Sequence, residues 1–430
     1  MTPSLTSLGA DHMAAQGGMF RFTTAGSVDD GKSTLIGRIL YDAKAVPDDQ
    51  LAALERSAQK RGDGTVDLSL LTDGLTAERE QGITIDVAYR YFATAKRKFI
   101  IADTPGHEQY TRNMVTGAST ADAAVILVDA RKGVIEQTRR HLTLAHLLGI
   151  PHLLVAINKM DLVGYEQAKF DELAAAITSF SASLGIAAPR IVPLSAKQGD
   201  NVVNPSDKMS WYGGPTLLTL LEELPPAIHV NQSPLRFPVQ LVARVREEGG
   251  GQKRLYQGRI ESGRLAVGDE IVILPAGSKT RITAISTFDG PLQSAEAPKS
   301  IGLEVADDVD IARGDLLVHE ASRPRVADSF EAMLCWFADE PFDPRGRYLA
   351  RLGTRTVSAR VSELIHRLDV VTQERIEAPE KLNRNDIARV RVMLQSSVPY
   401  DDYAENRATG AFILIDAQTN ATVAAGMIAA

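Results

Sequence analysis

The sequence is poor in cysteine, in net positive charge and in long apolar runs, and each shortage excludes a class of protein. Its 430 residues include one cysteine, which excludes an internal disulfide and a cysteine-based zinc site. Cys335 lies in an apolar run, where we expect a small buried side chain. No apolar run approaches the length of a membrane span, and residues 1–18 lack the basic and apolar parts of a secretory signal. We therefore expect a cytoplasmic protein with no membrane contact.

The charge balance is acidic, with a net charge of −7. This value argues against a strongly basic nucleic-acid binder, and we expect no nucleic-acid partner. A hydrophobic content of 44% and a charged content of 23% are ordinary for a globular protein. The chain is too long for a single core, so two or three domains are expected.

A phosphate-binding pattern, two glycines separated by four residues and followed by lysine and serine, lies near the start of the chain. Its residues are Gly26, Ser27, Val28, Asp29, Asp30, Gly31, Lys32 and Ser33, with Thr34 following. Residues 20–25 predict a short buried strand before the loop, and residues 34–41 predict the first turns of a helix after it. The strand and the later motifs argue against a chance match.

This loop has the chemistry to hold a triphosphate. Its glycines let backbone N–H groups approach the anion, and the N-terminus of the next helix adds further donors. Lys32 is expected to bridge the outer phosphates, and the Ser33 hydroxyl to ligate Mg²⁺.

Three continuous apolar runs, 99–102, 124–128 and 153–157, are typical of parallel strands buried on both faces. From Phe20 to about Leu224 such strands alternate with amphipathic helices, as βαβ units require. We predict an α/β domain over 19–228, with a mostly parallel sheet and helices on both faces. Ligands of such sheets bind at the carboxyl ends of the strands.

The first of these runs is followed by Asp103, Thr104, Pro105, Gly106 and His107. An aspartate at this strand end can hold Mg²⁺ through water. Gly106 can offer its N–H to a γ-phosphate and turn when that phosphate leaves. His107 is interpreted as the residue that orients the attacking water; the alternative is a surface histidine.

The third run is followed by Asn158, Lys159, Met160 and Asp161. Guanine presents N1–H and N2–H₂ side by side, so one carboxylate, that of Asp161, can select it over adenine. Asn158 is expected to tie loops together and contact the base, while the Lys159 stem packs on the purine face. After the next strand come Ser195, Ala196 and Lys197, whose backbone N–H groups suit the guanine O6. Together these motifs favour GTP over ATP.

A polar segment over 41–85 separates the first helix from Asp103. Thr84 near its end is a candidate second hydroxyl ligand of Mg²⁺ that orders the segment when a γ-phosphate is present. Ile83 and Val28 are candidates for an apolar gate in front of His107. A strand beginning at Ile83 is the structural alternative, and both can hold.

Beyond a proline-rich linker at 225–234 the pattern becomes all-β. Recurrent turn glycines predict a small antiparallel barrel over 233–322. Alternation at 356–361 and 389–394 predicts half-buried strands of a second barrel over 325–430. Residues 1–18 are expected to be a disordered leader, with Met19 a candidate start.

The order of these motifs, followed by two barrels, resembles the translational GTPase superfamily of elongation factor Tu. Residues 27–38 with 40–42, 108–114 and 406–416 narrow the resemblance to the large GTPase subunit of two-subunit bacterial ATP sulfurylase, also called sulfate adenylyltransferase. Elongation factors usually have histidine or serine at the position of Asp30.

The resemblance implies a heterodimer with a small catalytic subunit that joins ATP and sulfate into adenosine 5′-phosphosulfate and pyrophosphate. Coupling to GTP hydrolysis would draw this uphill reaction forward. The chain shows no second phosphate loop and no Ser-Gly-Gly-x-Asp-Ser loop, which agrees with adenylyl chemistry on the partner. Two alternatives share the motifs, an elongation-type GTPase that delivers aminoacyl-tRNA or a release factor and a stand-alone GTP-binding switch.

Overall fold

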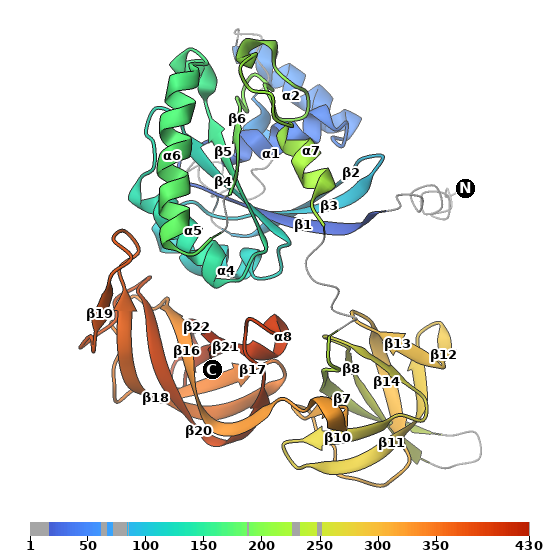
Figure 1. The fold of residues 1–430 in the computed structure, drawn as a ribbon. Coiled ribbons are helices and arrows are strands. Elements are labelled where there is room, and N and C mark those ends of the chain that lie inside the picture. The colour runs from blue at the N-terminus through green and yellow to red at the C-terminus, as the bar shows by residue number, and fades with distance from the viewer. Residues whose placement is uncertain are drawn as a thin grey trace, which may run out of the picture. The chain divides into compact units, whose positions relative to one another are not determined.

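The structure is a computed structural model, and it describes residues 17–61, 67–71, 84, 86–186, 189–225, 233–246 and 252–429. The chain divides into two compact units (Figure 1). The first comprises Met1–Ala227 with Val370–Gln373, and the second comprises Ile228–Asp369 with Glu374–Ala430. Of the expected leader, Gly17 and Gly18 belong to the first strand, and residues 1–16 lie outside the described part.

The first unit is built on a six-stranded sheet. In order across the sheet its strands are β2 (Ala88–Ala93), β3 (Arg97–Asp103), β1 (Gly17–Ala25), β4 (Ala123–Asp129), β5 (His152–Asn158) and β6 (Arg190–Pro193). The edge strand β2 runs antiparallel to β3, and every other neighbouring pair is parallel. The predicted mostly parallel sheet is confirmed, and its strands include the three apolar runs.

Helices cover both faces of this sheet (Figure 1). They are α1 (Lys32–Asp42), α2 (Asp48–Arg61), α4 (Thr111–Ala118), α5 (Glu136–Leu147), α6 (Gln167–Ser183) and α7 (Leu217–Glu223). Single 3₁₀ turns lie between them at η1 (Leu68–Leu71), η2 (Glu108–Tyr110), η3 (Met160–Val163) and η4 (Asp207–Met209).

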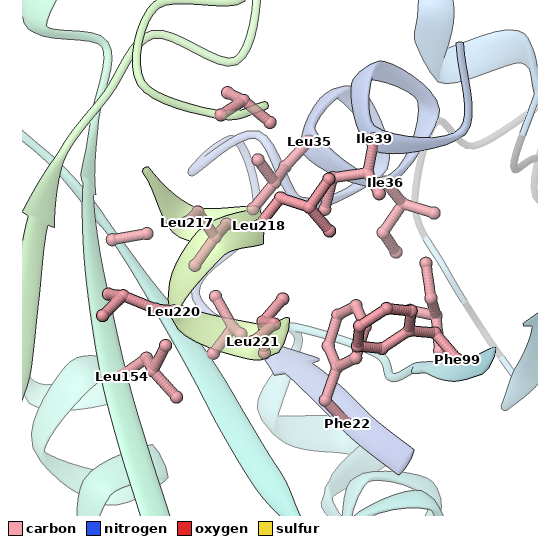
Figure 2. Packing of buried hydrophobic residues seen from close by; sticks show 14 of the residues in the cluster. Phe22, Leu35, Ile36, Ile39, Phe99, Leu154, Leu217, Leu218, Leu220 and Leu221 are labelled. Carbon is pink, nitrogen blue, oxygen red and sulfur yellow. The ribbon is translucent and has the colours of Figure 1, made fainter. Parts of the chain in front are cut away.

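The core on one face of the sheet fixes the position of α1 (Figure 2). Leu35 and Ile39, one helical turn apart on α1, pack with Leu221 of α7 over Phe22 and Phe99 of the sheet. All five side chains are buried, and each such side chain contributes about 1.5–3 kcal/mol on burial. Because α1 is anchored in this way, the phosphate loop at its N-terminus has a fixed support.

A close approach of η1 to α1 depends on one glycine. A Cβ at Gly37 would overlap the carbonyl oxygen of Leu68, so any larger residue would push η1 away. The α1 helix therefore has the sheet on one side and η1 on another.

The second unit begins with a closed antiparallel barrel, as predicted. Its ring follows the order β10 (Glu270–Leu274), β15 (Leu316–Val318), β7 (Phe237–Arg246), β8 (Gln252–Arg259), β14 (Ser300–Val305) and β11 (Ser278–Thr287), and β11 pairs back to β10. The short β12 (Gly290–Leu292) pairs antiparallel with β11, and β9 (Arg264–Ala266) pairs with β13 (Ser294–Glu296).

A second closed barrel follows after the turn η6 (Glu320–Ser322). Its ring follows the order β17 (Tyr348–Leu352), β21 (Ala411–Asp416), β22 (Thr422–Ile428), β16 (Arg325–Trp336), β20 (Ile387–Tyr400) and β18 (Arg355–Leu368), and β18 pairs back to β17. The short strand β19 (Arg375–Glu377) pairs with β18, and α8 (Arg407–Gly410) precedes β21. The expected alternation is present, since Val390, Val392 and Leu394 are buried between more exposed neighbours.

A buried ion pair joins the two barrels. Arg236, which precedes β7, donates from Nε and Nη2 to the two carboxylate oxygens of Asp401, both at 2.7 Å. A third bond runs from Arg236 Nη1 to the Ser322 carbonyl at 2.9 Å. Side-chain exposures of 5% and 6% place this pair away from water. A second ion pair, Arg355 with Asp315 at 3.2 Å, also joins the barrels.

Cys335 is buried in β16, as expected for a small apolar side chain. The alternative strand starting at Ile83 falls on a residue outside the described part, and β2 begins at Ala88. Within the residues that the structure covers, no helix has the length and apolarity needed to cross a membrane.

Candidate nucleotide site

The predicted phosphate loop joins β1 to α1, and residues with positive φ turn its backbone just before the helix. Gly31 caps α1 with φ of 95°, a left-handed conformation that a side chain strains. Its carbonyl accepts the Leu35 N–H at 2.9 Å, so the helix begins directly after it. Asp29 also has positive φ, 69°, which curls the loop just before the helix. The expected order of strand, loop and helix is therefore present.

Lys32 lies inside this loop and is buried. Its Nζ donates to the carbonyls of Gly26 and Ser27 at 2.8 and 3.0 Å. Burial lowers the pKa of Lys32, while the nearby carboxylates of Asp103 and Asp30 raise it. The ammonium therefore stands between the loop and the end of β3, where the outer phosphates are expected.

Asp30 is the unusual member of the loop, because a carboxylate is buried where phosphate is expected to bind. Its Oδ2 accepts the Ser27 N–H at 2.7 Å, which closes the loop on itself. Burial raises the pKa of Asp30 to about 6, against the Ser27 hydrogen bond and the Lys32 charge, which lower it.

The segment after β3 lies against the phosphate loop. The Thr104 hydroxyl donates to the Thr24 carbonyl at 2.6 Å and so ties the strand ends together. A Cβ at Gly106 would overlap Lys32 Nζ and the Gly26 carbonyl oxygen, so only glycine fits. Asp103 and Pro105 are buried beside it. This contact brings the end of β3 to the phosphate loop, as expected.

His107 follows this segment and is half-buried. Its Nδ1 accepts the Gln109 N–H at 3.2 Å, and its ring centroid lies 6.3 Å from that of Tyr110. The water-orienting role of His107 stays a prediction.

Gln137 of α5 is a contact of the site that the sequence reasoning missed. Its Nε2 donates to the Gly106 carbonyl at 3.2 Å and lies 3.1 Å from His141 Nε2. Burial, with the charges of Lys32 and Arg140, lowers the pKa of His141 to about 3. A neutral His141 ring can accept the Gln137 N–H, so α5 holds the Gly106 peptide in one orientation.

Asn158 connects the phosphate loop to the loop after β6. Its Nδ2 donates to the Asp30 carbonyl at 2.7 Å, and its Oδ1 accepts the Ala196 N–H at 2.9 Å. The predicted role of tying loops together is therefore visible in the geometry. The Ala196 N–H is therefore bonded to Asn158, and the next amide along that loop is the N–H of Lys197.

Asp161 and Lys159 are each held by a second side chain. The Ser195 hydroxyl donates to Asp161 Oδ1 at 2.7 Å. Lys159 Nζ lies 3.0 Å from Asp129 Oδ2 and also donates to the Asp29 carbonyl. Both residues therefore have set positions at the carboxyl end of β5.

Asp129 was also missed from the sequence. It ends β4 in register with Asn158 of β5, and it is 1% exposed. Burial raises its pKa, but hydrogen bonds from Arg131 and Lys159 outweigh this and lower the pKa below its ordinary value. Asp129 stays ionised and orients Lys159.

A cavity of about 650 Å³ gathers most of the residues that are predicted to read the base. The predicted residues that line it are Gly31, Thr34, Asn158, Lys159, Asp161, Ala196 and Lys197. Residues not predicted for the site also line it, namely Arg38, Tyr41, Asp67, Leu68, Leu162 and Gln198. Its walls combine a carboxylate, an amide, peptide groups and apolar surface, which suits a purine base.

The remaining predictions fall at the edge of what the structure describes. Thr84 is half-buried, but residues 81–83 and 85 beside it lie outside the described part. The proposed gate of Val28 and Ile83 lies outside it too, since Ile83 is one of those residues. Ser33 is the second residue of α1, directly after Lys32. The assignments of Ser33, Thr84 and Asp103 as magnesium ligands stay predictions.

Family models match three successive parts of the chain. Residues 18–228 match the elongation factor Tu GTP binding domain. Residues 254–318 match elongation factor Tu domain 2, and residues 329–429 match the GTP-eEF1A C-terminal domain-like family. The GTPase fold with two barrels is therefore found by sequence comparison as well.

Three relatives are similar over nearly the whole chain. "Sulfate adenylyltransferase subunit 1" of Aeromonas salmonicida is 50% identical, over 97% of this chain and 88% of its own length. "Bifunctional enzyme CysN/CysC" of Mycobacterium tuberculosis is 52% identical, over 95% of this chain and 67% of its own. "Bifunctional enzyme NodQ" of Rhizobium sp. is 51% identical, over 97% of this chain and 66% of its own. The chain thus spans about two thirds of the bifunctional relatives.

Proposed function

Since this chain belongs to the sulfate adenylyltransferase subunit 1 family of elongation-factor-Tu-type GTPases, we propose that it hydrolyses GTP to drive sulfate activation on a partner subunit. There ATP and sulfate would give adenosine 5′-phosphosulfate and pyrophosphate. The observation that carries the proposal is the cavity lined by Asn158, Lys159 and Asp161 in a chain half identical to a subunit 1 protein.

The cavity favours guanine because of where its polar groups lie. Asp161 can accept N1–H and N2–H₂, and the Ser195 hydroxyl bond on Oδ1 orients that carboxylate. Because the Ala196 N–H is bonded to Asn158, the Lys197 N–H beside it is the group that would meet the O6 side of the purine. The Lys159 stem, fixed by Asp129, would cover one face of the base.

Magnesium fits the oxygen groups at the phosphate end. Mg²⁺ prefers hydroxyl, carboxylate and phosphate oxygens, and we propose that Ser33, Asp103 and Thr84 hold it. Bound there, the ion would neutralise charge on the outer phosphates. Asp103 suits this position, since it is 2% exposed and interacts electrostatically with Lys32.

We propose His107 as the residue that positions the attacking water. It directly follows Gly106, which packs against Lys32, so it lies next to the expected position of the outer phosphates. GTPases of this kind are slow alone, and a group from a partner can add about 10³–10⁵ in rate. We therefore propose a small catalytic subunit as the partner in a heterodimer, which completes the site near Thr84 and His107.

Co-purification with that small subunit tests the proposal. The complex is expected to release pyrophosphate from ATP and sulfate faster with GTP than with a non-hydrolysable GTP analogue. The isolated chain is expected to hydrolyse GTP weakly and to make no phosphosulfate. Equal pyrophosphate release with GTP and its analogue would contradict coupling while leaving GTP binding intact.

The His107→Ala variant separates binding from hydrolysis. Loss of a positioned water-orienting group is expected to lower GTP hydrolysis by about 10²–10⁴, with GTP affinity within a few-fold of the parent. Tyr110→Phe is a matched control, because it keeps the neighbouring ring and removes only a hydroxyl. An unchanged hydrolysis rate in His107→Ala would remove His107 from the mechanism.

We also propose that the protein works in the cytoplasm, where cells hold the GTP and ATP that the reaction consumes. Fractionation of cells that produce the full-length protein would test this location.

A further inference from the structure

The side chain of Arg38 makes contacts far along the chain from its own helix. Arg38 lies on α1, and its Nε donates to the Ala196 carbonyl at 3.1 Å. Its Nη2 donates to the Lys197 carbonyl at 2.6 Å. The third nitrogen, Nη1, pairs with Asp42 Oδ1 at 3.3 Å, one helical turn later. With 18% of its surface exposed, the Arg38 side chain is largely enclosed by these partners.

The two bonds from Arg38 to the Ala196 and Lys197 carbonyls set the direction of backbone N–H groups in the 195–198 loop. A peptide unit is planar and trans, so its C=O and the N–H of the next residue point in opposite directions. Because Arg38 holds the Ala196 C=O, the Lys197 N–H must point away from the guanidinium. Holding the Lys197 C=O fixes the Gln198 N–H in the same way, and that N–H donates to Ser195 Oγ at 3.2 Å.

The loop is curled around the guanidinium group. Gly199 has φ of 86°, and a Cβ there would lie 3.5 Å from both Arg38 Cδ and Asp42 Oδ2. The Gly199 N–H donates back to the Ser195 carbonyl at 2.8 Å, which closes the turn. Asn158 holds the opposite side through the Ala196 N–H. The peptide groups of this turn are therefore oriented from two sides.

Only arginine can make this set of contacts. Two carbonyls and a carboxylate need donors in a fixed planar fork, which a guanidinium has and a lysine ammonium lacks. Arg38 also lies on α1, the helix that begins with Lys32, so this one helix contacts both the phosphate loop and the 195–198 loop. The cavity wall is formed in part by Arg38, Ala196 and Lys197 together.

We propose that Arg38 is a specificity-determining positioning residue, which aims the Lys197 N–H of the 195–198 loop at the O6 atom of guanine. The proposal rests on GTP as the ligand of this cavity. Asp161 reads the N1 and N2 side of the base, and Arg38 acts through peptide groups on the O6 side. Arg38 itself need not touch the nucleotide.

The test compares GTP with 6-thioguanosine 5′-triphosphate. The two differ only in the acceptor at position 6, where sulfur accepts hydrogen bonds weakly. The parent protein is expected to prefer GTP. In Arg38→Ala the GTP affinity is expected to fall about tenfold or more, while the thio analogue loses less, so the preference shrinks toward one.

Three further variants keep the test decisive. Arg38→Lys can reach one carbonyl and is expected to lie between parent and Arg38→Ala. Asp42→Asn leaves Arg38 in place and is expected to reduce the preference mildly. Arg56→Ala is the matched control, because Arg56 donates to the Ala52 carbonyl within its own helix, and no change is expected.

The outcomes separate this proposal from a structural role. If the Arg38 variants bind both nucleotides more weakly by the same factor, Arg38 only supports the fold and the proposal is wrong. Equal affinity of the parent for the two nucleotides would also overturn it, since O6 would not be read. Failure of the parent to bind GTP would instead overturn the proposed function.

Discussion

The ionised carboxylate of Asp30 is expected to destabilise the nucleotide-free protein, and Asp30→Asn is expected to recover that free energy. Burial raises the pKa of Asp30 from 3.8 to about 6, although the Ser27 hydrogen bond and Lys32 lower it. Because the folded-state pKa is above the unfolded one, the folded protein binds this proton more tightly. The stability from this group is present below pH 3.8 and is lost as the pH rises through about 6.

The size of the effect follows from the two pKa values. With 3.8 unfolded and about 6 folded, the carboxylate costs about 0.5 kcal/mol at pH 4 and about 3 kcal/mol at pH 7.5. Asparagine keeps an oxygen for the Ser27 N–H, and the folded pKa of about 6 already includes the stronger bond that the carboxylate accepts there. The net gain from Asp30→Asn is therefore expected to be about 3 kcal/mol at pH 7.5 and about 0.5 kcal/mol at pH 4.

Urea unfolding of the nucleotide-free chain measures this gain. The sequence has two tryptophans, and a Trp336→Phe background leaves Trp211 as the sole reporter of the first unit. The Trp211 ring centroid lies 5.3 Å from that of Phe170, and its Nε1 donates to the Tyr165 carbonyl at 2.9 Å, so its fluorescence follows that packing.

The exposed Asp49 supplies a control substitution. Asp49→Asn, at the start of α2, is expected to change the stability by less than about 0.5 kcal/mol. A gain in Asp30→Asn that is equal at both pH values would refute the argument, because it would not come from the charge.

Three other substitutions are expected to have measurable effects. Asp161→Ala removes the acceptor for N1–H and N2–H₂ and should lower GTP affinity about a hundredfold without weakening ATP; calorimetry that finds the GTP preference intact would refute the guanine site. Gln137→Ala frees the Gly106 carbonyl, so this peptide can turn its N–H to the γ-phosphate that GTP has and GDP lacks. The ratio of GTP to GDP affinity should therefore rise about fivefold; an unchanged ratio would contradict the inference that Gln137 fixes the Gly106 peptide. Arg236→Ala leaves Asp401 buried without its ion partner and should destabilise the second unit by about 3–5 kcal/mol. Trp336 fluorescence in a Trp211→Phe background measures that loss, and a value below about 1 kcal/mol would contradict it.

The sequence predicted the parts of the fold and site that are encoded in short stretches. Continuous apolar runs located β3, β4 and β5, and the residues just after β3 and β5 were recognised as site residues. Short stretches of this kind can be recognised without knowing which residues are in contact across the chain. The same holds for the barrels, where alternation in β18 and β20 follows which face is buried.

The missed residues act through contacts across the chain. Arg38 reaches a loop 158 residues away, and Gln137 reaches Gly106 from another helix. Arginine and glutamine are common on helix surfaces, so neither stands out by type. Asp129 had a usable signal, since it ends an apolar run as Asp103 does.

The closure of both barrels has a consequence for recognition by other proteins. A sheet that returns to its first strand pairs each strand of its ring on both sides, although within 233–246 and 252–429 the short strands β12 and β19 each pair with one neighbour. A protein that binds the rings themselves would therefore do so mainly through side chains and connecting turns. The binding affinity would then depend on individual side chains, and alanine scanning of the barrel surfaces can identify them.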